Sequence, residues 1–386
     1  MPLPAAALFF LVAAGESLRW SADVDTQARG RSEPTGGQTS QVGEISMSGR
    51  LGLDLRLPDE SASLTWSPRG LLREAISGQP TGTGNSTQQG GRFDMVARLT
   101  PTTRLGLRSG ADWGLTDFSP LASPATIPGS GLLPTQRFVR TLSLDAAVEL
   151  RHRFSRQLEL AASGGVQRTG GAGHEAVEVL PVQVGALSTA SLAWTTERDT
   201  VVALQTSASH TRFSLGRTSQ LSETQISWAS RPFRPVGCDL AAGVALIRSE
   251  AADATTLNVY ASGLAGLRWD IPLSPTRGLS TAVRGRLAPA IDRLTGLAVE
   301  NVRGESSADL VDGRIRFGLA ASGGRAISGI STGTEDLRFD AHSSWTLQRG
   351  VAVEAAFTTA WTNQQPLAGW QQQVYVGFHW SGAGAL

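Results

Sequence analysis

The chain has 386 residues, a formal net charge of +1 and one cysteine, Cys238. The balanced charge gives no reason to expect a nucleic-acid partner, and a lone cysteine excludes an intramolecular disulfide or a cysteine-based metal site. A hydrophobic fraction of 40% is typical of a soluble protein, but also of a transmembrane β-barrel, in which apolar and polar positions alternate along every strand.

An apolar run, PLPAAALFFLVAAG, occupies residues 2–15. It is too short to cross a bilayer as a helix, and it fits the hydrophobic region of a signal peptide that is cut near Gly15. No arginine precedes Arg19, so the usual positive start is missing, as a start codon assigned too late would explain. We expect residues 1–15 to be a signal peptide and residues 16–386 to be the barrel domain described next.

The stretch ISMSGRLGLDLRL, at residues 45–57, alternates strictly between two faces. One face carries Ile45, Met47, Leu51, Leu53, Leu55 and Leu57, and the other carries serine, arginine and aspartate. Period-2 alternation predicts a β-strand. Thirteen residues at about 3.3 Å each reach roughly 43 Å, enough for a tilted strand to cross a bilayer.

The same alternation recurs along the chain, for example in RLGLRSGADWGL at 104–115, where Leu105, Trp113 and Leu115 share the apolar face. Eighteen strands are predicted, and the least regular is 296–312. They are 17–25, 43–57, 61–67, 91–100, 103–117, 137–151, 155–168, 181–196, 199–213, 220–231, 236–249, 255–271, 278–290, 296–312, 313–325, 335–347, 350–362 and 370–382.

The predicted connections alternate in length. Those after even-numbered strands are short, whereas those after odd-numbered strands are long and rich in Gly, Ser, Thr, Pro and Gln: 26–42, 68–90, 118–136, 169–180, 326–334 and 363–369. Short turns on one side and long loops on the other are typical of bacterial outer-membrane barrels. The fold class is therefore all-β, a single 18-stranded antiparallel transmembrane barrel with short periplasmic turns and long extracellular loops, located in a Gram-negative outer membrane.

All ten tryptophans fall on the apolar face of their predicted strands. We expect them to form two membrane girdles at the headgroup level. The periplasmic girdle would hold Trp20, Trp194, Trp228, Trp269, Trp345 and Trp380, and the outer one Trp66, Trp113, Trp361 and Trp370.

Residues 16–382 resemble bacterial outer-membrane porins in pattern. VYVGFHW, at 374–380, resembles the last strand of such barrels, whose terminal aromatic is recognised by the barrel-assembly machinery, but six residues follow it here. The chain is also similar to the 18-stranded barrels that complete polysaccharide secretion. That resemblance implies a periplasmic polysaccharide-export protein as a partner, besides outer-membrane lipid and lipopolysaccharide, and it implies no cofactor.

The polar face is expected to line a hydrated lumen, because eighteen strands make a barrel too wide for side chains to fill. The predicted pore-lining residues carry both signs of charge, which favours neutral, polar cargo such as carbohydrate over strong ion selectivity. They are Arg50, Asp54, Arg56, Asp94, Arg98, Arg104, Arg108, Asp112, Asp145, Arg284, Arg286, Arg316, Arg338, Asp340 and Glu354.

Two loop segments are unusually apolar. We expect 118–136 to fold into the barrel as a constriction loop through Leu121, Ile127, Leu132 and Leu133. RGLLREAIS, at 69–77, could form an amphipathic helix through Leu71, Leu72 and Ile76. For both segments the alternative is packing against neighbouring loops or a partner.

No catalytic or metal-binding constellation is predicted. GISTG, at 329–333, lies in a predicted loop and lacks the strand–turn–helix context of a nucleophile elbow, and the five histidines have no metal-ligand spacing. The leading functional hypothesis is a non-enzymatic channel that exports a polysaccharide. A diffusion porin and a closed barrel acting as scaffold or receptor are the alternatives.

Overall fold

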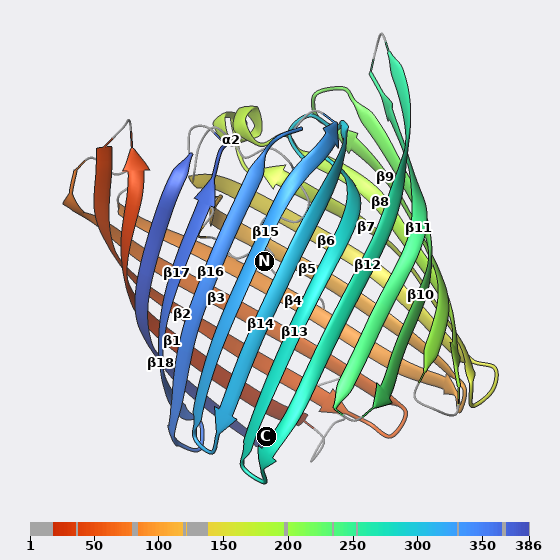
Figure 1. Cartoon of the computed structure of the whole chain (residues 1–386), viewed down its shortest axis with the longest axis horizontal. Helices are drawn as coiled ribbons and strands as arrows, with labels where there is room; N and C mark the ends of the chain where they lie inside the picture. The colour runs from red at the N-terminus through yellow and green to blue at the C-terminus, as the bar shows by residue number, and fades with distance from the viewer. Residues whose placement is uncertain are drawn as a thin grey trace.

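The chain forms one closed β-barrel, here described from a computed structural model (Figure 1). The structure describes residues 18–35, 38–78, 84–118, 121, 138–196, 200–233, 235–251, 254–329, 332–364 and 368–385. The predicted signal peptide therefore lies outside the described residues.

Eighteen strands and one short helix make up the regular structure of the described residues. They are β1 (Leu18–Thr35), β2 (Gln38–Arg56), β3 (Glu60–Ser77), β4 (Gly84–Thr100), β5 (Thr103–Asp117), β6 (Phe138–Arg153), β7 (Leu158–Gly171), α2 (His174–Val179), β8 (Gln183–Thr195), β9 (Val201–Phe213), β10 (Thr218–Phe233), β11 (Val236–Glu250), β12 (Thr255–Ser274), β13 (Arg277–Ile291), β14 (Ala298–Asp312), β15 (Ile315–Gly329), β16 (Glu335–Gln348), β17 (Val351–Thr362) and β18 (Gly369–Ala385).

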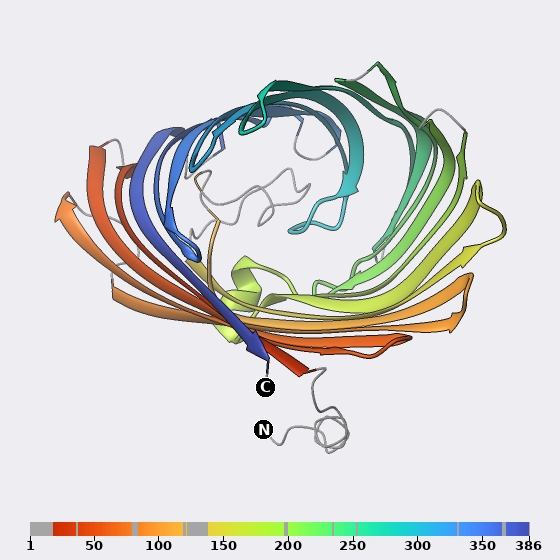
Figure 2. The same ribbon diagram turned by 90° about the horizontal axis from the view of Figure 1, so that it is seen from below.

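Every strand pairs antiparallel with its neighbours in sequence, and β1 pairs with β18 to close the ring (Figure 2). The closing register runs from Arg19 opposite Ala385 to Ser32 opposite Gln372. The last strand therefore continues beyond Trp380, so the residues after the predicted terminal aromatic belong to the barrel wall.

The predicted strand count is confirmed, and each predicted strand has one counterpart. Even the least regular segment forms a strand, β14. The even-numbered strands lead into connections of two to five residues at the end of the barrel where β1 begins and β18 ends, which we call the turn end. At the opposite end, the loop end, connections range from two to twenty residues.

Two predicted loops are wrong. Most of 26–42 and 68–90 is strand, because β1 runs to Thr35 and β3 to Ser77. The predicted helix at 69–77 is part of β3, with Arg69 and Leu71 directed into the lumen and Leu72 and Ile76 exposed. Leucines on both faces imitate a helical pattern there, but pairing with β2 and β4 satisfies the backbone as a sheet.

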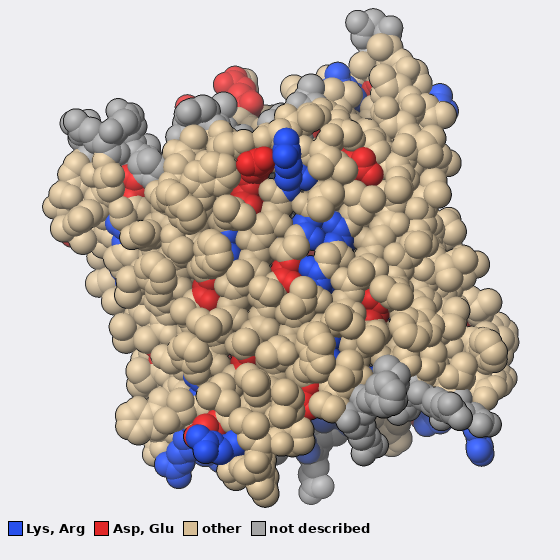
Figure 3. Space-filling view, viewed as in Figure 1, with Lys and Arg blue, Asp and Glu red and all other residues tan. Residues whose placement is uncertain are grey.

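The outer wall is apolar. Leucine, valine, isoleucine, phenylalanine and tryptophan side chains on alternate strand positions remain exposed, including Val148, Val166, Leu204 and Val259. In Figure 3, side chains other than arginine and the acidic residues cover most of the face in view, with a group of arginines at its lower edge. An apolar surface of this extent is stable only in contact with lipid.

Seven of the ten tryptophans follow this pattern, and Trp20, Trp269 and Trp361 are only partly exposed. Trp113, Trp194, Trp345 and Trp370 are among those with exposed rings on the outer wall. Trp66 lies in the middle of the extended β3 rather than at its end. Within the described ranges, no helical segment has the length and apolarity that a membrane crossing requires.

Candidate functional site: the lumen and its loop end

The inward face of the wall carries the predicted pore-lining residues, because the register places them opposite the apolar positions of each strand. In β2, for example, Arg50, Asp54 and Arg56 alternate with outward-facing leucines. Several predicted residues meet an oppositely charged neighbour. Arg108 Nε lies 2.8 Å from Asp94 Oδ1, and Arg338 Nε lies 2.7 Å from Asp340 Oδ2.

Other predicted arginines pair with acids that the sequence analysis did not single out. Arg316 Nη2 lies 3.0 Å from Asp309 Oδ1, and Arg284 Nη2 lies 3.5 Å from Asp239 Oδ2. These arginines line a cavity of about 1290 Å³ along β11 to β16. The wall there alternates positive and negative groups, so it presents a hydrated, nearly neutral surface.

Burial of the lumen charges changes sharply along the barrel axis. The Arg108 side chain, on the middle of β5, is 62% exposed, whereas Arg31 and Arg73, near the loop ends of β1 and β3, are 5% and 2% exposed. Unpaired charges cannot be buried cheaply, so an arrangement of this kind requires partners. The lumen is therefore open and wet along the middle of the wall and filled at the loop end near β1 to β3.

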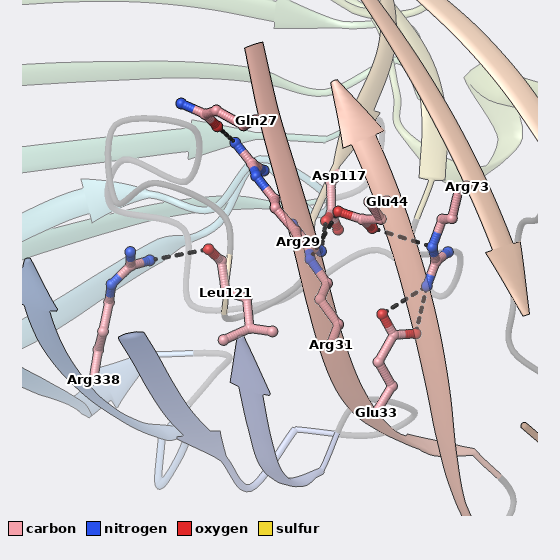
Figure 4. Close-up of polar contacts among 9 residues, drawn as sticks. All are labelled: Gln27, Arg29, Arg31, Glu33, Glu44, Arg73, Asp117, Leu121 and Arg338. Carbon is pink, nitrogen blue, oxygen red and sulfur yellow. Dashed lines mark hydrogen bonds and ion pairs between the residues drawn. The ribbon is translucent and has the colours of Figure 1, made fainter. Parts of the chain in front are cut away.

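A network of arginines and carboxylates fills the loop end of the lumen (Figure 4). Glu44 forms ion pairs with two guanidinium groups, with Arg31 Nε at 3.0 Å and Arg73 Nε at 3.2 Å. Arg73 Nη2 also reaches Glu33 at 2.5 Å, and Arg31 Nη1 reaches Asp117 Oδ2 at 2.6 Å. We call Arg29, Arg31, Arg69, Arg73 and Arg338, with Glu33, Glu44, Asp117 and Asp340, the loop-end charge cluster.

Leu121, which follows β5 in the chain, lies in the lumen beside this cluster. Leu121 is buried, and its carbonyl accepts a hydrogen bond from Arg338 Nη1 at 3.2 Å (Figure 4). Arg338 projects from β16, on the side of the barrel opposite Asp117. Of the four predicted constriction residues, Leu121 thus lies inside the barrel. Ile127, Leu132 and Leu133 lie outside the described residues.

Gly114 explains why β5 turns inward. Its φ of +148° is one that other residues rarely adopt, and an added Cβ would lie 2.4 Å from Gln88 Cα. After this kink Leu115 lines the lumen cavity, so its predicted place on the apolar face with Trp113 is wrong. The kink also directs Asp117 towards Arg31.

A second inward segment comes from the β13–β14 connection, residues 292–297. The buried Asp292 carboxylate accepts from Leu294 N and Thr295 N at 3.0 and 2.8 Å, which folds the segment into a compact turn. Ser219 and Ser249, on β10 and β11, donate to the Gly296 carbonyl at 2.5 and 3.0 Å. The turn is therefore fixed against β10 and β11, three and two strands along the wall from β13.

An apolar cluster joins the inward segments to the helix at the loop end. Phe118, Val139 and Leu180 are buried together, and Ala176 and Val179 of α2 pack against them with Leu294 of the 292–297 turn. We call Phe118, Leu121, α2 and residues 292–297 the loop-end barrier.

Between Leu121 of the barrier and the wall lies a cavity of about 580 Å³. Its lining includes Arg29, Arg69, Arg338, Gln373 and Tyr375. Sequence reasoning missed Arg29, Arg31, Glu33, Arg69 and Arg73, because they lie in segments predicted to be solvated loops. Their alternate spacing, Arg29-Arg31-Glu33 and Arg69-Arg73, was the available signal.

Among the described residues, no group of three or more His, Cys, Asp or Glu is placed to hold a metal ion. His342, Asp309 and Asp340 lie on the inner wall, where the His342 Nε2 to Asp309 Oδ1 distance is 3.7 Å. The described lumen therefore presents ion pairs and polar side chains to whatever passes through it.

Solved structures with the same fold include outer-membrane proteins. Pseudomonas aeruginosa OccK9 (OpdG) aligns with a TM-score of 0.52 at 10% identity, and the alignment covers 96% of this chain and 99% of that chain. Pseudomonas aeruginosa OccK1 (OpdK) and Acinetobacter baumannii OccAB1 align with TM-scores of 0.50, at 10% and 8% identity, each covering 96% of this chain and 99% of the other. At these identities the likeness shows the fold alone.

No curated protein matches the chain closely enough to count as a relative. A family model does match, over residues 10–374, which is nearly the whole of the 386-residue chain. It describes an exopolysaccharide export family, in agreement with the secretion barrels that the strand pattern resembles. The chain is therefore an outer-membrane β-barrel channel that belongs to the EpsX exopolysaccharide export family.

Proposed function

We propose that the barrel is the exit channel of an exopolysaccharide and that the loop-end barrier keeps it closed at rest. The observation that supports this proposal is the change in burial of the lumen charges, from open side chains in the middle of the wall to the filled loop end. In outer-membrane barrels the turn end faces the periplasm and the loop end faces outside. The polymer would thus enter an open lumen and meet the barrier last.

The barrier has contacts suited to reversible opening. Asp117 is held by its ion pair with Arg31, and Leu121 by the hydrogen bond from Arg338 to its carbonyl. Each is a polar contact that a hydrated polymer can replace. The constriction would be completed by Leu121, Ile127, Leu132 and Leu133, as the sequence predicts, and by the 292–297 turn.

The remaining roles follow from an export channel. The chain would not act as an enzyme, and the pore-lining charges would serve to keep the path hydrated. A periplasmic polysaccharide-export protein would dock at the turn end. The tryptophan girdles would contact lipid and lipopolysaccharide, residues 1–15 would direct export of the chain, and β18 would engage the barrel-assembly machinery.

Single-channel conductance in a planar bilayer tests the closed state. The intact barrel is expected to be silent most of the time, and a variant lacking residues 120–133 is expected to conduct steadily. Arg338→Ala should raise the open probability without enlarging the open current, because it removes one contact of the barrier. Arg108→Ala, which removes a lumen arginine away from the barrier, is the matched control.

A steady, ohmic current in the intact barrel would contradict the closed state and favour a diffusion porin. Silence of both the intact and the deleted barrel, with folding confirmed, would favour a scaffold. In cells, deletion of the gene should abolish surface polysaccharide while small-solute uptake persists. Unchanged surface polysaccharide would refute the export function itself.

A further inference from the structure

The cavity behind the loop-end barrier contains more guanidinium groups than its carboxylates neutralise. Glu44 is shared by Arg31 and Arg73, Glu33 is bound by Arg73, and Asp117 is bound by Arg31. On the opposite wall, Asp340 is bound by Arg338 and also accepts a hydrogen bond from Thr358. The carboxylates of the cluster are thus already engaged.

Arg29 and Arg69 are left over. Within the described part of the chain, neither forms an ion pair with a carboxylate, although both line the cavity and are half-buried. Arg29 contacts the Gln27 side chain, but its Nε is buried without a hydrogen-bond partner. A guanidinium shielded from water is costly unless a negative group meets it, so these two arginines form an incomplete site.

The wall beside them, on β18, carries further unfulfilled polar groups. Gln373 lines the cavity and is 7% exposed, and its Oε1 is buried without a partner. Tyr375, the next residue on the inward face, presents its ring 5.8 Å from the Arg29 guanidinium carbon. An amide, an aromatic ring and two free guanidinium groups around a cavity of about 580 Å³ are suited to a polar, negatively charged ligand.

We propose that this cavity binds an acidic sugar unit of the exported polymer, whose carboxylate is held by Arg29 and Arg69. The inference rests on the proposed export function and adds the class of polymer to it. A carboxylate matches the planar, forked geometry of guanidinium groups. Arginines of the same cluster already bind carboxylates, Arg73 with Glu33 and Arg31 with Asp117. The polymer would occupy the site as it passes the barrier.

Binding of defined oligosaccharides to the refolded full-length barrel tests this assignment. Titration calorimetry compares tetragalacturonate with maltotetraose, a neutral tetrasaccharide. Tetragalacturonate should bind at least tenfold more tightly than maltotetraose. The Arg29→Gln/Arg69→Gln barrel should lose at least tenfold in affinity for tetragalacturonate and keep its affinity for the neutral sugar.

A charge-matched control removes two other lumen arginines, Arg98→Gln/Arg104→Gln, which face each other on β4 and β5 near the turn end. This variant should bind tetragalacturonate like the unmodified barrel, and heat-dependent mobility in gels confirms that all variants fold. Equal weakening by both double variants would mean that the general charge of the lumen, and not this cavity, attracts the acid, and would overturn the proposal.

Absence of tetragalacturonate binding, or equal binding of the neutral sugar, would also overturn it. Those results leave the export function standing if surface polysaccharide still depends on the gene. Loss of that dependence would instead refute export, whatever the oligosaccharides do.

Discussion

Removal of Arg73 isolates the energetic role of the loop-end charge cluster. Its side chain is 2% exposed and contacts Glu33 at 2.5 and 2.6 Å and Glu44 at 3.2 Å. Arg73→Met keeps much of the volume but leaves two buried carboxylates short of a positive partner. Breaking a buried pair in this way costs about 3–5 kcal/mol. Arg108→Met, which breaks the matched exposed pair of Arg108 with Asp94, should lower the stability by only about 0–1 kcal/mol.

Both losses are measured as changes in the free energy of unfolding of the barrel in lipid vesicles. Urea titration followed by tryptophan fluorescence gives this free energy for each variant. Adding Glu33→Gln to Arg73→Met should recover part of the loss, because a neutral amide is cheaper to bury than an unpaired carboxylate. Equal losses for Arg73→Met and Arg108→Met would refute the reasoning, since burial would then have no influence on the strength of these pairs. A further loss in the double variant would refute it as well.

Two further substitutions test the faces of the wall and the kink in β5. Val166→Arg, on the lipid face in the middle of β7, should destabilise the barrel by about 2–4 kcal/mol, whereas Gln167→Arg, which faces Asp145 across the lumen wall, should be nearly neutral by the same titration. Gly114→Ala should cost about 1–3 kcal/mol, because the residue has a φ of +148° and no room for a Cβ. Gly91→Ala on neighbouring β4, where the nearest atom would be 4.0 Å away, is its control, and comparable losses at the two glycines would contradict the kink.

The membrane-crossing part of the fold could be predicted because lipid imposes a strict rule on it. Each position that faces lipid must be apolar, so the alternation in segments such as 45–57 is visible without a partner strand. Where a strand extends beyond the membrane, its outward positions no longer have to be apolar. In β1 the outward residues Thr26, Ala28 and Gly30 are no longer strongly apolar, so the periodic signal fades although the strand continues.

The pairings within the charge cluster were beyond sequence reasoning for a different reason. Glu33 and Arg73 are 40 residues apart, and Arg338 lies 217 residues from the carbonyl that it binds. Alternation shows that such side chains face inward, but only closure of the barrel decides which of them meet. The leucines of 118–136 suggested an inward course for that loop, and Leu121, the one of them that the structure describes, lies inside the barrel.

The pairing of β1 with β18 has a consequence for the order of folding. All other neighbouring strands are consecutive in the chain and can add one hairpin at a time, whereas this seam joins residues as distant as Asp25 and His379, which are 354 positions apart. Bringing such distant segments together carries a large entropic cost, which falls only when a curved sheet has already brought the two edges near. The β1–β18 seam is therefore the last junction to form, and until it forms the edges of β1 and β18 are unpaired within the membrane.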